Sequence, residues 1–485
     1  MAPTANDYIA ALPQIFLLGM SCVLLLAALF VNRGRDEVLH YGSLGTIAGL
    51  AIITGMLFRG HSMLAFQGML IQDAMGDVLM LFCYAITGTV MVYARPYLRD
   101  RGLLSGEFYL LLLLALLGSM IIIQSYNLIV LYLGVELLAL SLYTLVALAR
   151  DDGTASEAAM KFFVLGAIAA GTLLFGMSLI YGMTGTLNIG ILAAHLSGGH
   201  DVGLAVWIGL GFVVVSMAFE LGAVPFHMWL PDVYEGAPSS MAIFVGSVPK
   251  LAAFGFFMRL LVQGLGDLHS AWMWILVVIA VASLAIGAIV AIAQTNIKRM
   301  LAYSTINHAG FILLGILTGT AEGYRAALFY TIAYVIMFAG AFGVIILLSR
   351  AGFEAERIED FKGLNERSPW FAFIMLMMMF SMAGVPPFIG FFAKLEIIRA
   401  LVGSGLTWLA VVAVAFAVIA AFYYLYVAKV MYFDRVDVGE AGQVEQGLQG
   451  PADMKLLLSV NGLVVLGLGI FPGGLLALCK AVIGF

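Results

Sequence analysis

The sequence predicts an all-α, polytopic membrane protein with about 14 transmembrane helices. Of its 485 residues, 63% are hydrophobic and 11% are charged, whereas about a quarter of the residues of a soluble domain are charged. The mean hydropathy is +1.06, and apolar runs of about 20 residues, the length that spans a bilayer, follow one another along the chain. The net charge of −5 includes no basic patch, so we expect the lipid bilayer and not nucleic acid as a partner.

The first apolar run, residues 12–31, is long enough to span a membrane and has no basic segment before it, so we expect a retained helix and not a cleaved signal peptide. Further runs predict spans near 41–58, 74–94, 107–123, 127–149, 158–182, 204–229, 239–263, 271–293, 301–318, 325–349, 369–401, 406–432 and 455–476. The two longest polar stretches, 350–368 and 433–454, have the composition of solvated connectors. The chain 1–485 is therefore predicted to form a single membrane domain.

Lys and Arg are distributed unevenly over the loops that these spans predict. Cytoplasmic loops of membrane proteins carry an excess of both residues. One side carries Arg33, Arg95, Arg99, Arg101, Arg150, Lys298, Arg299, Arg350, Arg357, Lys362, Arg367, Lys429, Arg435 and Lys455, and the other carries little beyond Arg59, Arg259, Arg325, Arg399 and Lys480. This bias predicts that the basic loops face the cytoplasm and that both termini lie on the outer side of the membrane.

Two apolar runs contain prolines that would break a helix at membrane depth. The sequence Val-Pro-Phe at 224–226 is echoed by Val-Pro-Pro-Phe at 385–388, so the breaks are expected near Pro225 and Pro386. Non-helical backbone in a bilayer is tolerated only where it is buried in protein or lines a wet cavity. The echo predicts two inverted repeats, about 107–263 and about 271–432, each with one discontinuous helix.

Four ionisable residues stand out within the predicted spans: Glu136, Glu220, Lys250 and Lys394. A charged side chain at a lipid-exposed helix centre costs about 2.5–3.5 kcal/mol, so we expect these four to face the protein interior as a polar axis. Lys161 is a candidate fifth member of this axis. The alternative is that its amine reaches the cytoplasmic rim of the membrane.

Two histidines, His227 just past the first break and His308, could relay protons near neutral pH. The alternative is that each ring is buried, neutral and bonded to a protein group. The three cysteines, Cys22, Cys83 and Cys479, show no paired spacing for zinc or iron–sulfur ligation. We therefore expect no metal site and no cofactor site in this chain.

The four ionisable residues suggest a proton-transfer mechanism. Burial or a nearby cation disfavours the charged form of a lysine, and an approaching carboxylate restores it. Movement of charge along Glu136, Glu220, Lys250 and Lys394 could therefore alternate proton loading with proton release.

Four segments together resemble one known family: VPFHMWLPDVYEGAP, AQTNIKRMLAYSTINHAG, MAGVPPFIGFFAKL and LYLGVELLALSLYTLVAL. They are similar to the antiporter-like, proton-translocating membrane subunits of respiratory complex I, over nearly the whole chain. The resemblance implies a pumping module of NADH:quinone oxidoreductase, an H⁺-translocating enzyme complex, coupled to electron transfer in a separate arm. It also implies other membrane-arm subunits as partners, including a second antiporter-like subunit. NADH, FMN, iron–sulfur clusters and quinone would then be bound by partner subunits and not by this chain.

The same resemblance assigns roles to individual residues. Glu136 matches the glutamate of the family's fifth helix, Lys250 the central lysine of its eighth, and Lys394 the lysine of its broken twelfth. Glu220 departs from the family, which usually has a lysine at that place on the seventh helix. Two carboxylates in one low-dielectric site do not both ionise cheaply, so one is expected to hold a proton unless Lys250 or Lys161 approaches.

Two other functions share these sequence features. A cation/proton antiporter or a membrane-bound hydrogenase module would carry the same broken helices and lysines, and co-purifying subunits would distinguish it. A structural spacer that has lost pumping would account for Glu220, and the proton stoichiometry of the reconstituted complex would distinguish that.

Overall fold

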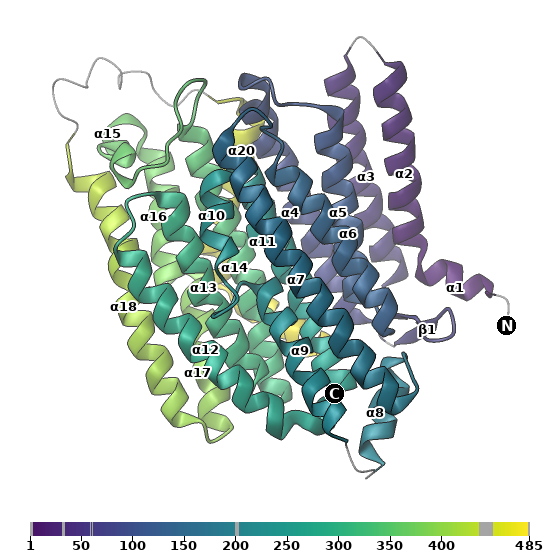
Figure 1. The fold of residues 1–485 in the computed structure, drawn as a ribbon. Helices are drawn as coiled ribbons and strands as arrows, with labels where there is room; N and C mark the ends of the chain where they lie inside the picture. The colour runs from purple at the N-terminus through teal and green to yellow at the C-terminus, as the bar shows by residue number, and fades with distance from the viewer. Residues whose placement is uncertain are drawn as a thin grey trace. The chain divides into compact units, whose positions relative to one another are not determined.

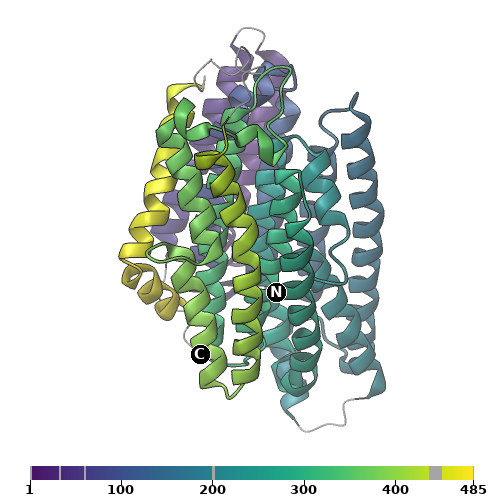
Figure 2. The ribbon, with the colours of Figure 1, turned by 90° about the vertical axis from the view of Figure 1, so that its left-hand side faces the viewer.

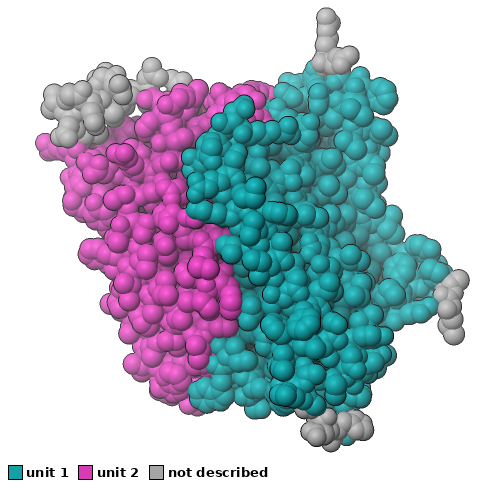
Figure 3. All heavy atoms as spheres, in the orientation of Figure 1, with its two compact units in different colours: residues 1–91, 104–221, 248–276 teal, residues 92–103, 222–247, 277–485 magenta. Residues whose placement is uncertain are grey.

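The computed structural model describes residues 3–31, 34–58, 60, 62–198, 203–435 and 450–483, and Figure 1 follows the chain through them. Arg33 and Arg59, used above to predict orientation, and most of the polar stretch 433–454 lie outside the described residues. The chain forms two compact units (Figure 3). Unit 1 comprises Met1–Met91, Leu104–Leu221 and Val248–Leu276, and unit 2 comprises Val92–Leu103, Gly222–Ser247 and Val277–Phe485.

Unit 1 is built mainly from the N-terminal helices. It contains α1 (Ala5–Ala10), α2 (Leu12–Phe30), α3 (Arg35–Leu57), most of α4 (Ala74–Asp100), α5 (Gly106–Gln124), α6 (Leu128–Val146), α7 (Gly153–Thr184), α8 (Ile189–Ser197) and α9 (Leu204–Leu221). The second half of α11 (Ser239–Phe256), the π-helix η1 (Phe257–Gly264) and the 3-10 turn η2 (Gly266–Leu268) also belong to it. Strands β1 (Met63–Ala65) and β2 (Leu70–Gln72) form an antiparallel hairpin that pairs Leu64 with Ile71.

Glycines let two helix pairs of unit 1 approach closely. A Cβ atom on Gly118 of α5 would lie 2.5 Å from the backbone nitrogen of Leu138 on α6. A Cβ on Gly176 of α7 would likewise lie 2.8 Å from the carbonyl oxygen of Gly209 on α9. Small residues at such crossings are the usual basis of helix association in membranes, where lipid offers no hydrophobic driving force between helices.

Unit 2 is built mainly from the C-terminal helices. It contains α10 (Trp229–Gly236), most of α12 (His269–Ile292), α13 (Ile297–Ile316), α14 (Ala321–Leu348), η3 (Ile358–Phe361), α15 (Leu364–Arg367), α16 (Pro369–Ala383), α17 (Ile389–Gly403), α18 (Thr407–Phe433), α20 (Ala452–Ile470) and α21 (Gly473–Val482). Helix α14 is the core of the unit, because its apolar stretch is buried throughout. Helix α18 packs against α16, and the two lie side by side in Figures 1 and 2.

Each predicted span corresponds to a helix or a broken helix. Twelve helices of the described residues are long and apolar enough to cross a membrane. The two predicted spans outside these twelve are α13, which is more polar and starts with Lys298 and Arg299, and the region 369–401, which is divided between α16 and α17. Polar residues in the first region and the break in the second explain why neither forms a long apolar helix. The predicted all-α membrane fold is confirmed.

Both predicted breaks are present. Helix α9 ends at Leu221 and α10 begins at Trp229, while α16 ends at Ala383 and α17 begins at Ile389. The residues that follow the first helix of each pair, Gly222 (φ +78°) and Gly384 (φ +89°), adopt the left-handed conformation that ends many helices. Prolines and glycines thus interrupt the helix together, and the assignment of two inverted repeats stays a prediction.

Candidate functional site

A buried lysine lies at the end of the broken helix in unit 1. Lys250 of α11 is only 1% exposed, and its Nζ donates a hydrogen bond to the backbone carbonyl of Glu220 at 3.0 Å. Glu220 is in the last turn of α9, where carbonyl groups have no helical donor. A cation at this end of a helix is stabilised by the partial negative charge of those carbonyls.

The carboxylate of Glu220 links Lys250 to a second carboxylate, that of Glu136. Glu220 interacts electrostatically with both Lys250 and Glu136, so the structure brings these three predicted residues together in unit 1. Tyr143 of α6 interacts with both carboxylates, and Tyr132, one turn before Glu136, hydrogen-bonds with it. The sequence analysis missed the two tyrosines, although their spacing of four and seven residues from Glu136 places all three on one helix face.

A second lysine lies at the end of the broken helix in unit 2. Lys394 of α17 is 6% exposed, and its Nζ donates to the carbonyls of Met382 and Ala383, each at 2.9 Å. These carbonyls belong to the last turn of α16. The Nζ also lies 5.3 Å from the ring centroid of Phe311, which is cation–π range. A Cβ on Gly384 would lie 2.9 Å from Lys394 Cδ, so the backbone passes directly against the lysine.

His308 lies in a hydrogen-bonded network within unit 2. Its ring is 1% exposed, with Nδ1 2.7 Å from the hydroxyl of Tyr330 and Nε2 3.0 Å from that of Tyr424. The Tyr424 hydroxyl also bonds with Ser304, and Lys394 acts on His308 electrostatically. A phenol both donates and accepts hydrogen bonds, so protons can enter at one ring nitrogen and leave from the other.

His227 and Lys161 have surroundings that suit the alternatives given for them. The ring of His227 hydrogen-bonds with the carbonyl of Pro225, and its Nδ1 is buried with no hydrogen-bond partner among the residues described. Lys161 forms an i,i+4 ion pair with Glu157 at 2.8 Å, and its side chain is 45% exposed. His227 thus bonds with a carbonyl freed by the break, and Lys161 lies on the surface of the chain.

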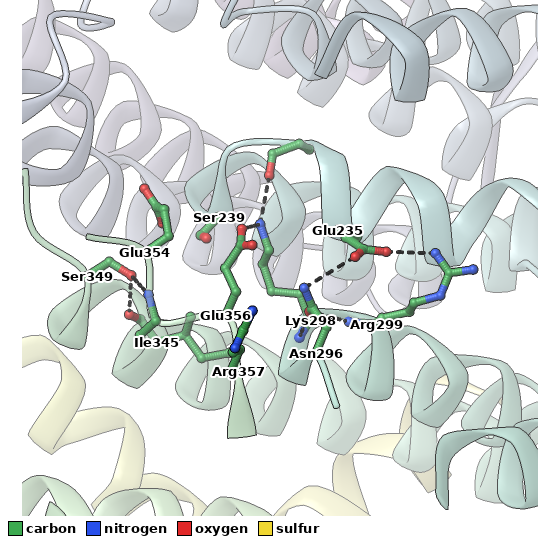
Figure 4. Close-up of polar contacts among 12 residues, drawn as sticks. Glu235, Ser239, Asn296, Lys298, Arg299, Ile345, Ser349, Glu354, Glu356 and Arg357 are labelled. Carbon is green, nitrogen blue, oxygen red and sulfur yellow. Dashed lines mark hydrogen bonds and ion pairs between the residues drawn. The ribbon is translucent and has the colours of Figure 1, made fainter. Parts of the chain in front are cut away.

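A polar network in unit 2 holds α10 to the start of α13 (Figure 4). Arg299 of α13 lies 2.9 Å from Asp232 and 2.7 Å from Glu235, both on α10. Figure 4 shows the pair with Glu235. The neighbouring Lys298 is 2% exposed and lies 2.6 Å from Glu356. Lys298 Nζ also donates to the carbonyl of Ala237, the residue after α10, at 3.4 Å. The sequence analysis used both cations only to predict orientation, whereas in the structure both also bind the short helix after the break or its end.

Arg259 was expected in an outer loop, and this expectation was wrong. Its side chain is 0% exposed in the π-helix η1, where NH1 and NH2 each lie 2.6 Å from an oxygen of Asp73. Burial raises the pKa of Asp73, but the charge and hydrogen bonds of Arg259 and the Gly76 amide outweigh it and hold that pKa below its usual range. The pair lies 186 residues apart in sequence, so no local pattern indicates it.

The described residues contain no group of three or more His, Cys, Asp or Glu side chains that could hold a metal ion. The cysteines are free: Cys22 is exposed, and Cys83 and Cys479 are buried.

Comparison with known proteins identifies relatives along the whole chain. The family described as NADH:quinone oxidoreductase/Mrp antiporter, TM, matches residues 125–420. NADH-quinone oxidoreductase subunit N of Thioalkalivibrio sulfidiphilus (strain HL-EbGR7) is 53% identical over 480 residues, with 99% of each chain covered. The protein of the same name from Nitrosomonas europaea is 52% identical, with 98% of each chain covered.

Solved structures also match. A chain of respiratory complex I from Thermus thermophilus with bound aureothin superposes with a TM-score of 0.81 at 28% identity, covering 96% of this chain and 98% of that one. A chain of the membrane-bound sulfane sulfur reductase, an archaeal respiratory membrane complex, gives a TM-score of 0.86 at 24% identity, covering 98% and 97%. At that identity the second match supports the fold alone.

Proposed function

This chain belongs to the NADH:quinone oxidoreductase/Mrp antiporter family, among relatives that are subunit N of NADH-quinone oxidoreductase, and from this we propose that Lys250 and Lys394 carry protons through it. The chain is a proton-translocating membrane subunit of complex I. Its partners are other membrane-arm subunits of complex I, and we propose that these include a second antiporter-like subunit.

The observation that carries this proposal is common to both lysines. Each is buried, and each donates to a backbone carbonyl in the last turn of the helix that ends at a break, α9 or α16. The carbonyls stabilise the ammonium form, while burial opposes it. A small change in neighbouring charge therefore decides whether the proton stays on the amine.

In unit 1 that change comes from the carboxylates. Glu220 interacts electrostatically with Lys250 and also with Glu136. A proton that binds Glu220 removes a negative charge near the ammonium, which then releases its own proton. When Glu220 loses its proton again, the charge that favours the ammonium returns. Glu220 can thus carry a proton although the family usually has a lysine there.

In unit 2 the proton donor is the His308 network. His308 bonds with Tyr330 and Tyr424 and interacts electrostatically with Lys394. A proton arriving on the ring repels the charge of Lys394, so the two groups favour alternating protonation. Phe311 and the carbonyls of Met382 and Ala383 hold the ammonium when it forms.

Two further parts of the assignment rest on the family and on charge bias. NADH, FMN, iron–sulfur clusters and quinone bind to partner subunits, and this chain supplies proton transfer without redox chemistry. The protein is a multi-pass membrane protein of the bacterial inner membrane. The Lys and Arg bias favours an orientation with both termini in the periplasm.

The experiment is proton pumping by the complex reconstituted in liposomes with Lys250→Ala in this subunit. We expect fewer protons moved per NADH oxidised, with normal assembly. Lys480→Ala, which removes an exposed lysine, is the matched control. A Lys250→Ala complex that assembles and pumps at the parental ratio would favour the spacer function instead.

A further inference from the structure

We propose that Asp77 is a proton-exchanging group of unit 1, which passes protons between Lys250 and the membrane surface next to the β1–β2 hairpin, and that Asp73 and Arg259 position it. This inference rests on the proposed function of Lys250. Asp77 lies in the first turns of α4, directly after the hairpin.

The ion pair beside Asp77 is formed by Arg259 and Asp73, and each already has its partner. Arg259 donates to both oxygens of Asp73, and its Nε donates to the carbonyl of Ile123 at 2.9 Å. Asp73 also accepts from the backbone amide of Gly76 at 2.8 Å, as the N-cap of α4. The guanidinium is 0% exposed, so its single positive charge is balanced within the protein by Asp73.

Asp77 is a second carboxyl group with no such counter-ion. It follows Asp73 by one helical turn and is 1% exposed, and its Oδ2 has no hydrogen-bond partner among the residues that the structure describes. The titratable groups that act on it are Asp73, Arg259 and Tyr84, and Arg259 is already bound to Asp73. An unpaired buried carboxylate is costly, and binding a proton removes that charge at this place.

Three glutamines near this pair also have buried polar atoms without partners among the described residues. Gln72 hydrogen-bonds with Asp77 and is 4% exposed, yet its Oε1 has no partner among the described residues. Gln14 donates to Gln124 at 2.5 Å, which leaves Gln14 Oε1 and Gln124 Nε2 buried without partners there. Two of these three glutamine atoms, Gln72 Oε1 and Gln14 Oε1, are acceptors like Asp77 Oδ2. Since buried polar groups are almost always satisfied, these acceptors require donors that water or a bound proton supplies.

A continuous stretch of helical backbone connects Lys250 to Arg259 of this cluster. Lys250 lies on α11, which continues as η1 to Arg259. Nine residues separate the two along the chain, a rise of about 13 Å, so transfer requires intervening water. In the forward step the Lys250 ammonium gives its proton to water, the Asp77 carboxylate takes one up, and the neutral carboxyl then releases it to the surface.

The test uses the complete reconstituted complex with Asp77→Asn, Asp77→Glu and, as control, Asp36→Asn. Asp36 is an exposed carboxylate in the first turn of α3. Two properties are measured: protons moved per NADH oxidised, and the infrared band of a protonated carboxyl between pH 6 and pH 9. We expect Asp77→Asn to lose the pH-dependent band and to pump less, Asp77→Glu to shift the band and keep pumping, and Asp36→Asn to change neither.

The outcomes separate proton exchange from a structural role. An assembled Asp77→Asn complex with the parental band and pumping ratio overturns the proposal. If Asp77→Asn does not assemble, an unshifted band in Asp77→Glu overturns it, and so does failure of both variants to assemble beside an intact Asp36→Asn complex. Parental pumping by Lys250→Ala would instead refute the proposed function of Lys250, whatever the Asp77 variants do.

Discussion

The Nζ of Lys250 donates a hydrogen bond of 3.0 Å to the backbone carbonyl of Glu220, so the lysine of α11 is held by the last turn of α9. The bond uses the main chain of Glu220 and leaves its carboxylate available to bind a proton. The carboxylate of the same residue also acts on Lys250 electrostatically. One residue therefore provides a fixed acceptor and a variable charge for the same amine.

Lys394→Ala should lower proton transfer several-fold while the complex still assembles. The variant removes the amine that bonds with Met382 and Ala383 and no large part of the core. Proton uptake by liposomes containing the complex measures the effect, with Lys480→Ala as the control. Parental pumping by an assembled Lys394→Ala complex would refute the role of this residue.

Glu220→Gln should impair pumping, because the amide keeps the shape and hydrogen bonding of the side chain but cannot ionise. Glu136→Gln provides the comparison on the neighbouring helix, and proton transfer and quinone reduction are measured in both. If Glu220→Gln pumps like the parent and Glu136→Gln does not, Glu220 is a passive occupant. The proton path would then run through Glu136 and Lys250, because Lys161 is exposed and paired with Glu157.

Restoring the family's usual residue with Glu220→Lys should not improve pumping. A new cation close to Lys250 would favour the neutral form of one of the two amines. The same proton-transfer assay decides this, and a rate above that of the parent would contradict the expectation.

Gly384→Ala should reduce proton transfer more than Gly352→Ala. Both glycines are in the left-handed region, with φ of +89° and +78°, so both variants carry a conformational cost of about 1–2 kcal/mol. A Cβ on Gly384 would meet the side chain of Lys394, whereas a Cβ on Gly352 would have nothing within 4 Å. Equal loss of pumping in the two assembled variants would show that the contact with Lys394 has no role.

Asp73→Asn should lower the free energy of unfolding by about 3 kcal/mol at neutral pH, since Arg259 would lose the charge of its buried partner. The pKa of Asp73 is lowered in the folded protein, so its carboxylate stabilises the fold above the ordinary pKa of aspartate, about 3.9. This stabilisation is lost as the pH falls through the lowered folded value. The difference in melting temperature between parent and variant should therefore shrink on acidification from pH 7. A difference that is independent of pH would argue against the charge effect.

Both termini should lie in the periplasm. Alkaline phosphatase fused after the C-terminal residue should be active, because this enzyme works only outside the cytoplasm, and a cytoplasmic reporter at the same place should be inactive. The reverse pattern would invert the predicted orientation.

Much of the fold could be predicted from the sequence because a bilayer imposes a linear requirement on the chain. Every spanning segment needs about 20 apolar residues, so the spans and the two breaks were visible as runs and prolines. The same cost of burying charge singled out Glu136, Glu220, Lys250 and Lys394. The short elements α1, α8 and the β1–β2 hairpin were missed, since none is long or apolar enough to be recognised in this way.

Only the tertiary structure decided which groups meet. The pairing of Arg259 with Asp73, the phenols on both ring nitrogens of His308 and the exposed position of Lys161 depend on how separate helices pack. Hydrophobic periodicity fixes the face of one helix on which a residue lies, but it carries no information about the helix opposite. The sequence by itself therefore singled out four charges within apolar runs, and packing determined which carbonyl, carboxylate or phenol each of them contacts.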